Sequence, residues 1–122
     1  MIIIEKLYSI SISTADLEDS VTFYKDIFGF DVIERQSGSS EALMQMGEII
    51  LRLSQVDPLQ DIAREENYFT FYVDEDDFDD ALEEIEENEL DIVYGPENIR
   101  NGRKIVILDP DGNRIGLTSV SK

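Results

Sequence analysis

The stretch Asp109-Pro110-Asp111-Gly112-Asn113 lies between two apolar runs, Lys104 to Leu108 and Ile115 to Leu117. Proline restricts φ at the second position of a turn, aspartate side chains accept hydrogen bonds from nearby backbone amides, and glycine lets the chain reverse direction. The stretch therefore predicts a β-hairpin at the end of the fold.

Residues 9–13 read SISIS, an alternation that predicts a strand with one face on a core and the other on a wetter surface. Asp16 is placed to cap the start of a helix and Gly29 to end it. The helix's predicted buried stripe is Leu17, Val21, Tyr24, Ile27 and Phe28. Three more short strands, expected as an antiparallel meander, are Phe30 to Arg35, Ala42 to Met46 and Ile49 to Leu53.

The same pattern then begins again. Side chains of two different kinds alternate along Asn67 to Val73, which predicts a strand with two distinct faces. The pattern of residues 74–88 predicts an acidic but amphipathic helix. The last expected strands are Leu90 to Tyr94, Lys104 to Leu108 and Arg114 to Thr118. Two β-α-β-β-β modules offset by about 60 residues follow from this order of elements. We expect one α+β domain with module one at 1–56, module two at 66–122 and a connection at 57–65.

Composition excludes several classes of function. The chain has 122 residues, no cysteine and no histidine, so thiolate nucleophiles, disulfides and imidazole ligands are excluded. A formal net charge of -18 argues against binding nucleic acid phosphates. No apolar run is long enough for a signal-peptide core or a membrane span, which predicts a soluble cytoplasmic protein.

The order and spacing of several motifs resemble the vicinal oxygen chelate superfamily, which includes glyoxalase I, extradiol dioxygenases, and fosfomycin- and bleomycin-resistance proteins. The matching motifs are Asp16-Leu17-Glu18-Asp19-Ser20, Phe23-Tyr24, Phe28-Gly29-Phe30 and Asp109-Pro110-Asp111-Gly112-Asn113. The resemblance covers essentially the whole chain. It implies curled mixed sheets around a cavity, with the helices outside.

The resemblance also implies where a metal ion would be bound in catalytic relatives. The four ligand positions of the family fall on Ser9, Arg52, Tyr68 and Gly116, with the assignment of Arg52 fixed to within about one residue. Glycine has no side chain, arginine is a permanent cation, and neutral hydroxyls bind divalent ions poorly. We therefore predict no metal ion, no other cofactor and no catalytic residues.

Without a metal ion, the resemblance still implies a cavity, and its lining would consist of hydroxyls, aromatic rings and guanidinium groups. Its predicted ligand-binding residues are Ser9, Ser11, Ser13, Arg52, Tyr68, Thr70, Tyr72, Arg114 and Thr118. Such a lining suits a small molecule. The bleomycin-resistance branch, whose members sequester a cationic drug, is the nearest in character, and the negative charge would help to recruit a cation.

Several alternatives remain open from the sequence. Arg52 could bind a ligand carboxylate or phosphate, or it could form an internal ion pair with Glu41 or Glu48. The protein could instead be a lyase, isomerase or dioxygenase relative with a non-standard active site. A third reading is a regulatory protein that acts through its acidic helix. Since the chain carries only two modules, the family resemblance implies a homodimer in which each cavity borrows residues from the partner.

Overall fold

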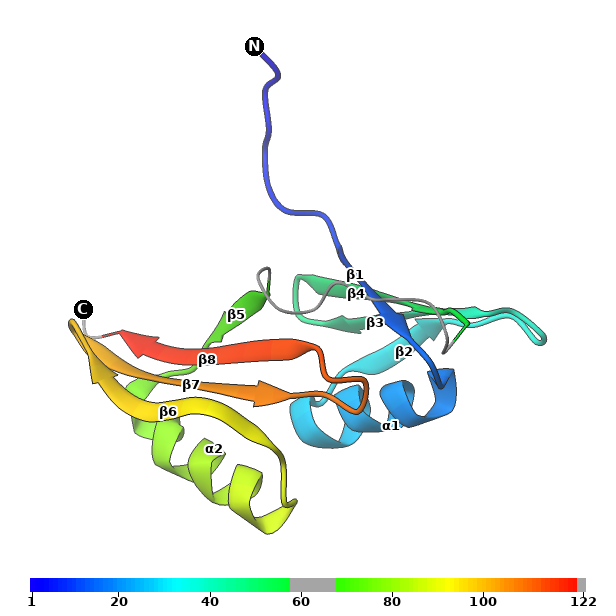
Figure 1. Ribbon diagram of the computed structural model, residues 1–122. Coiled ribbons are helices and arrows are strands. Elements are labelled where there is room, and N and C mark those ends of the chain that lie inside the picture. Colours follow the sequence, from blue (N-terminus) through cyan, green and yellow to red (C-terminus); the bar gives the residue numbers. More distant parts are fainter. Residues whose placement is uncertain (58–67, 121–122) are drawn as a thin grey trace. The chain divides into compact units, whose positions relative to one another are not determined.

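The computed structural model describes residues 1–57 and 68–120, which include two mixed sheets, each with one helix (Figure 1). The chain divides into two compact units, residues 1–62 and 63–122. The predicted connection at 57–65 lies outside the described residues except for Asp57, as does Asn67 at the start of a predicted strand.

The first unit contains β1 (Ile10–Thr14), α1 (Leu17–Phe28), β2 (Asp31–Glu34), β3 (Glu41–Met46) and β4 (Ile49–Gln55). Its sheet has the order β1-β4-β3-β2, with β1 parallel to β4 and the other pairs antiparallel. The predicted meander of β2, β3 and β4 is confirmed. β1 lies one residue later than the predicted strand, because Thr14 continues the pairing to Gln55.

The ends of α1 follow from local sequence. The Asp16 carboxylate accepts a hydrogen bond from the Asp19 amide at 3.2 Å, and Gly29 has the left-handed φ of 79° that ends the helix. Leu17, Val21 and Tyr24 are buried against the sheet, whereas Ile27 and Phe28 of the predicted stripe are only half-buried. The predicted caps at Asp16 and Gly29 are both confirmed, and the predicted buried stripe is confirmed in part.

The second unit repeats this order with β5 (Phe69–Tyr72), α2 (Glu75–Glu87), β6 (Ile92–Ile99), β7 (Gly102–Leu108) and β8 (Arg114–Val120). Its sheet order, β5-β8-β7-β6, corresponds strand by strand to the first. The two predicted β-α-β-β-β modules are confirmed. β6 extends five residues beyond the predicted end at Tyr94, because its pairing with β7 continues through two register shifts to Ile99.

Each sheet has one face covered by its helix and one face that is more polar. In the first unit Ile12, Leu51 and Leu53 are buried on the helix side, and in the second Ile107 and Ile115 are fully buried with Phe78 of α2. The faces opposite these carry the two serines of β1 and Tyr72 of β5. None of the described helices is long and apolar enough to cross a membrane.

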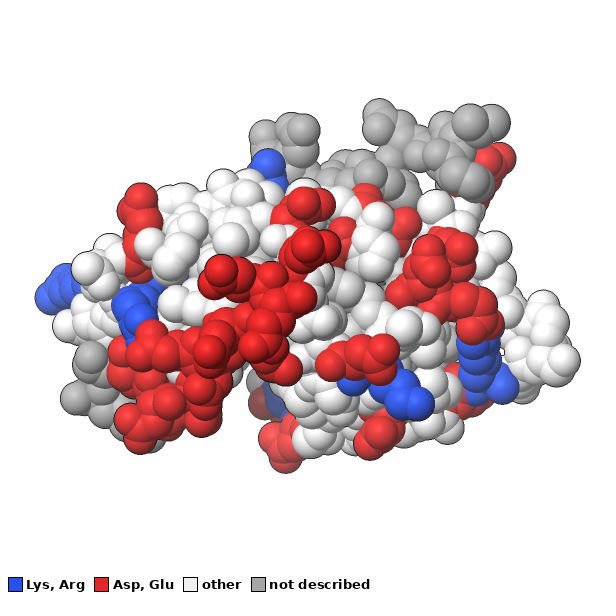
Figure 2. All heavy atoms as spheres, turned by 90° about the horizontal axis from the view of Figure 1, so that it is seen from below, with Lys and Arg blue, Asp and Glu red and all other residues white. Residues whose placement is uncertain are grey.

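Acidic side chains gather over α2, as Figure 2 shows. The first turn of α2 carries Glu75, Asp76 and Asp77, a favourable placement beside the positive end of the helix dipole. Phe78 and Ile85 are buried, so the helix is amphipathic as predicted.

Candidate functional site

Arg52 of β4 points away from the helix side of the first sheet. Its neighbours Leu51 and Leu53 are fully buried on the opposite face, and Ser11 of β1 is its partner across the strands. The Arg52 Nη1 atom lies 3.2 Å from Glu41 Oε2, and the Ser54 hydroxyl donates to Glu41 Oε1 at 3.2 Å. Of the alternatives for Arg52, the internal ion pair with Glu41 is therefore the arrangement found.

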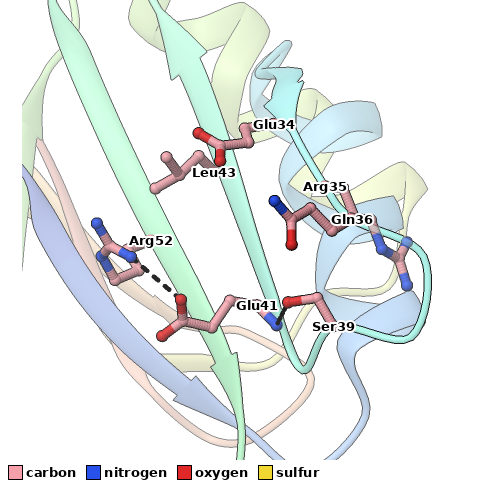
Figure 3. A pocket seen from close by; sticks show the side chains of 7 residues that line it. All are labelled: Glu34, Arg35, Gln36, Ser39, Glu41, Leu43 and Arg52. Atoms are coloured by element: carbon pink, nitrogen blue, oxygen red, sulfur yellow. Dashed lines mark hydrogen bonds and ion pairs between the residues drawn. The ribbon is translucent and has the colours of Figure 1, made fainter.

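A shallow polar hollow of about 140 Å³ surrounds this ion pair (Figure 3). Figure 3 shows Glu41 and Arg52 directed toward each other, whereas Arg35 turns outward, where its guanidinium pairs with Glu18. The lining residues come from β2, β3, β4 and the loop after β2: Glu34, Arg35, Gln36, Ser39, Glu41, Leu43 and Arg52. Both arginines of the lining are therefore paired with carboxylates, Arg52 with Glu41 inside the hollow and Arg35 with Glu18 outside it.

A larger hollow of about 370 Å³ lies in the second unit and includes Tyr68. The Lys104 ammonium donates a hydrogen bond to the Tyr68 hydroxyl at 2.9 Å and lies 5.2 Å from the centre of its ring. The ammonium therefore lies beside the hydroxyl end of the ring, and the hydrogen bond is the main contact between the two side chains. The full lining is Tyr68, Val93, Tyr94, Ile99, Lys104, Val106 and Arg114.

The hydroxyl of Tyr94 donates to the carboxylate of Glu97 at 3.0 Å. This hydrogen bond raises the pKa of Tyr94 above its ordinary value, because removing the phenol proton would lose the bond and place two negative charges together. Tyr94 therefore keeps its phenol proton, and the hollow brings two tyrosine hydroxyls together with two basic side chains, Lys104 and Arg114.

Gly116, which the family resemblance predicts at a ligand position, lies next to Thr70 on the neighbouring strand. A Cβ atom added at Gly116 would lie 2.5 Å from Thr70 Oγ1 and 3.1 Å from Thr70 Cγ2. The space that a ligand side chain would need is thus occupied by the Thr70 side chain.

The residues that the family resemblance predicts at the four ligand positions do not fit a divalent metal ion. Arg52 brings a cation, the Tyr68 hydroxyl is engaged by Lys104, and Gly116 lacks a donor. In residues 1–57 and 68–120, no group of three or more acidic side chains is arranged to hold an ion.

The other predicted site residues are distributed over the two sheets. Arg114 lies with Tyr68 in the larger hollow, and Arg52 lies in the smaller one. Neither hollow is lined by the serines of the first strand, by Tyr72, which is 55% exposed, or by Thr118, whose hydroxyl donates to the Arg103 carbonyl at 3.1 Å. Sequence reasoning missed five wall residues of the larger hollow that lie on β6 and β7, namely Val93, Tyr94, Ile99, Lys104 and Val106.

Comparison with known proteins identifies the family. A model of the Glyoxalase/Bleomycin resistance protein/Dioxygenase superfamily matches residues 6–117. The chain is 33% identical over 111 residues to the metallothiol transferase FosB of Staphylococcus epidermidis, an alignment that covers 88% of this chain and 77% of FosB.

Solved structures agree with this assignment. The fosfomycin resistance protein FosX of Mesorhizobium loti matches with a TM-score of 0.79 and 26% identity, over 98% of this chain and 95% of FosX. FosX of Listeria monocytogenes matches with a TM-score of 0.84 and 21% identity, over 98% of this chain and 94% of FosX. This match shows the shared fold. The chain therefore belongs to the glyoxalase/bleomycin resistance protein/dioxygenase superfamily, as its motifs predict.

Proposed function

We propose that this chain binds a small molecule in the larger hollow of its second half, without a metal ion, and acts by sequestering that molecule. The observation that carries the proposal is the joint placement of Tyr68, Tyr94, Lys104 and Arg114 around one hollow. The substituted ligand positions, Ser9, Arg52, Tyr68 and Gly116, favour binding without metal-dependent chemistry.

The lining suggests the chemical class of the ligand. Lys104 and Arg114 offer positive charge, the tyrosine hydroxyls offer hydrogen bonds, and Val93, Ile99 and Val106 offer apolar contact. A compact molecule that joins an oxyanion to a short apolar part fits these groups. Fosfomycin, a phosphonate, has this chemistry, and the FosX relatives are named for resistance to it.

Calorimetry with fosfomycin, methylphosphonate and inorganic phosphate in the presence of EDTA tests the proposal. Lys104→Met and Arg114→Met should each weaken binding at least ~10-fold, the loss of one charge-assisted hydrogen bond. Arg100→Met, an exposed cation outside the lining, is the matched control and should leave binding unchanged. Binding that disappears in EDTA and returns with manganese would show that the proposal is wrong.

A cationic ligand of the bleomycin type is the second candidate, because the acidic surface over α2 would attract it (Figure 2). Calorimetry with bleomycin-type glycopeptides at low and moderate salt tests this version. An absence of heat at both salt concentrations would remove that class of ligand.

An enzymatic role is the alternative that the relatives favour, since FosB is named as a metallothiol transferase. We expect phosphorus NMR to show fosfomycin unchanged after incubation with the protein, a thiol and manganese. Conversion to a thiol adduct would establish the enzyme instead.

A further inference from the structure

Tyr68 and Tyr94 bring two hydroxyl groups to the larger hollow, and the hydrogen bonds of these groups run in opposite directions. The Tyr94 hydroxyl donates to Glu97 Oε2 at 3.0 Å, whereas the Tyr68 hydroxyl accepts from Lys104 Nζ at 2.9 Å. A carboxylate only accepts hydrogen bonds and an ammonium only donates them, so neither direction can reverse. The two phenols therefore present different groups to a ligand.

The proton of the Tyr68 hydroxyl is a donor that a ligand can use. The oxygen of this hydroxyl is engaged by Lys104, and its proton has no acceptor among residues 1–57 and 68–120. The Lys104 ammonium has further N–H groups beyond the one that it directs to Tyr68. Together the two side chains form a pair of donors for an oxyanion, and Arg114 adds a basic group to the same lining.

The oxygen of Tyr94 is, by contrast, an acceptor. Its proton is directed to Glu97, so only its lone pairs can meet a ligand in the hollow. The described lining of the hollow contains no carboxylate. An O–H group of a ligand therefore finds its side-chain acceptor at Tyr94.

An irregular stretch of β6 holds Glu97 against Tyr94. In a regular strand, side chains three positions apart lie on opposite faces. The register of β6 with β7 shifts on both sides of Tyr94, and Gly95 has a left-handed φ of 81°. A Cβ atom at Gly95 would clash with the carbonyl oxygen of Lys104, so only glycine fits there. The irregularity turns Glu97 toward Tyr94, and Glu97 thereby orients the phenol proton.

We propose that the larger hollow selects a tetrahedral oxyanion that keeps one proton, such as the monoanion of a phosphonate. Lys104 and Tyr68 donate to its ionised oxygens, and its P–O–H group donates to the oxygen of Tyr94. Glu97 is a positioning residue, because it acts through Tyr94 and keeps the phenol proton away from the ligand. This inference rests on the proposed function and adds to it the protonation state of the ligand.

Methylphosphonate and methanesulfonate test this selection at about pH 6, in EDTA and at constant ionic strength. The two monoanions have the same charge and a similar shape, but only methylphosphonate carries an O–H group. Calorimetry should show methylphosphonate binding at least ~10-fold more tightly. Tyr94→Phe should reduce this preference below ~3-fold, whereas Tyr68→Phe should weaken the binding of both ligands equally.

The pH dependence of binding is a second readout. The charged or titratable groups that face Tyr94 are Glu97 on β6, Lys104 on β7, Arg114 on β8 and Tyr68 before β5. The chain has no histidine and no cysteine, the side chains whose ordinary pKa lies nearest neutrality, so a rise from about pH 6 to about pH 8.5 acts chiefly on the ligand.

Loss of the remaining ligand proton over this range should weaken the binding of methylphosphonate at least ~5-fold and leave that of methanesulfonate unchanged. Attraction to Lys104 and Arg114 alone would have the opposite effect, because the dianion carries more negative charge. The weakening should be absent in Tyr94→Phe. A weakening of equal size in that variant would assign the effect to the net charge of the chain and overturn the inference.

Glu97→Gln tests the positioning role. The glutamine amide can donate to the Tyr94 oxygen and release the phenol proton toward the hollow, so the preference for methylphosphonate should fall at least ~3-fold. Glu87→Gln removes the same charge from the exposed face of α2, outside the lining, and is the matched control that should keep the preference. An unchanged preference in Glu97→Gln overturns the role of Glu97.

The outcomes separate this inference from the proposed function. Equal affinities for methylphosphonate and methanesulfonate in the unmodified protein, or a full preference that survives in Tyr94→Phe, overturn the inference and leave the proposed function standing. No binding of fosfomycin, methylphosphonate or methanesulfonate overturns the proposed function, and the inference with it.

Discussion

Asp109 is only 5% exposed, yet its charge is satisfied by the turn that it begins. Its carboxylate accepts hydrogen bonds from the amide of Asp111 at 2.9 Å, the amide of Asn113 at 2.8 Å and the side-chain amide of Asn113 at 3.0 Å. Buried carboxylates normally cost stability unless they are bonded in this way. Asp109 is therefore a structural residue of the β7–β8 hairpin.

Asp109→Ala should lower the free energy of unfolding by about 3 kcal/mol, because three donors lose a charged acceptor. Asp109→Asn keeps one acceptor oxygen and should cost about half as much. Urea unfolding followed by circular dichroism measures both. Asp80→Ala, an exposed aspartate of α2, is the control and should stay within ~0.5 kcal/mol of the unmodified protein. Equal effects of Asp109→Ala and Asp80→Ala would contradict this role.

Gly116 and Thr70 form a second local constraint. A methyl group at Gly116 would clash with Thr70 Oγ1, so Gly116→Ala should destabilise the protein by about 1–3 kcal/mol. Thr70→Ala removes the two closest atoms, and Gly116→Ala in that background should cost less than ~1 kcal/mol. A double-mutant cycle in urea measures the coupling. Additive costs would show that Thr70 is not the obstacle.

At the scale of elements, α2 depends on one residue of the neighbouring sheet. Arg103 of β7 lies 3.0 Å from Glu75 and 2.8 Å from Asp79, and its guanidinium lies 4.7 Å from the centre of the Phe78 ring. Both acids lie in the first two turns of α2, so Arg103 offsets, from outside the helix, part of the negative charge gathered there.

Arg103→Ala should lower the free energy of unfolding by about 1–2 kcal/mol. Solvent screens the ion pairs, since the Glu75 and Asp79 side chains are 50% and 81% exposed, so much of this effect comes from the packing on Phe78. Arg103→Lys keeps the charge but loses the planar group. Its free energy of unfolding should therefore lie between those of the unmodified protein and Arg103→Ala. Urea unfolding at low and high sodium chloride measures the three proteins. A loss that vanishes completely at high salt would contradict the part assigned to packing.

The sequence allowed the caps of α1, the repeated order of elements and the closing hairpin to be predicted, because each depends on residues close together in the chain. The walls of the larger hollow could not be predicted. Lys104 reaches Tyr68 across 36 residues, and two register shifts between β6 and β7 place the neighbours Val93 and Tyr94 in the same lining. A simple alternation of faces along β6 fails at such bulges.

At the scale of the whole molecule, the dominant property is charge. With 28 acidic and 10 basic residues, acidic side chains outnumber the cations available to pair with them; Arg35, Arg52 and Arg103, for example, pair with four acids. The remaining like charges repel one another in the folded state more than in the expanded chain. Folding therefore proceeds against an electrostatic cost that salt reduces.

Raising sodium chloride from about 20 mM to about 300 mM should raise Tm by roughly 3 °C or more, because screening weakens this repulsion. The dependence of Tm on salt should be weaker in a variant that lacks four negative charges of α2. Its substitutions are Asp80→Asn, Glu83→Gln, Glu84→Gln and Glu87→Gln, at acids that take no part in the ion pairs with Arg103. Scanning calorimetry at matched protein concentration measures both proteins, since association of any kind makes Tm depend on concentration. A Tm that stays constant or falls with salt in the unmodified chain would mean that the acidic side chains are too far apart, or too well solvated, to oppose folding.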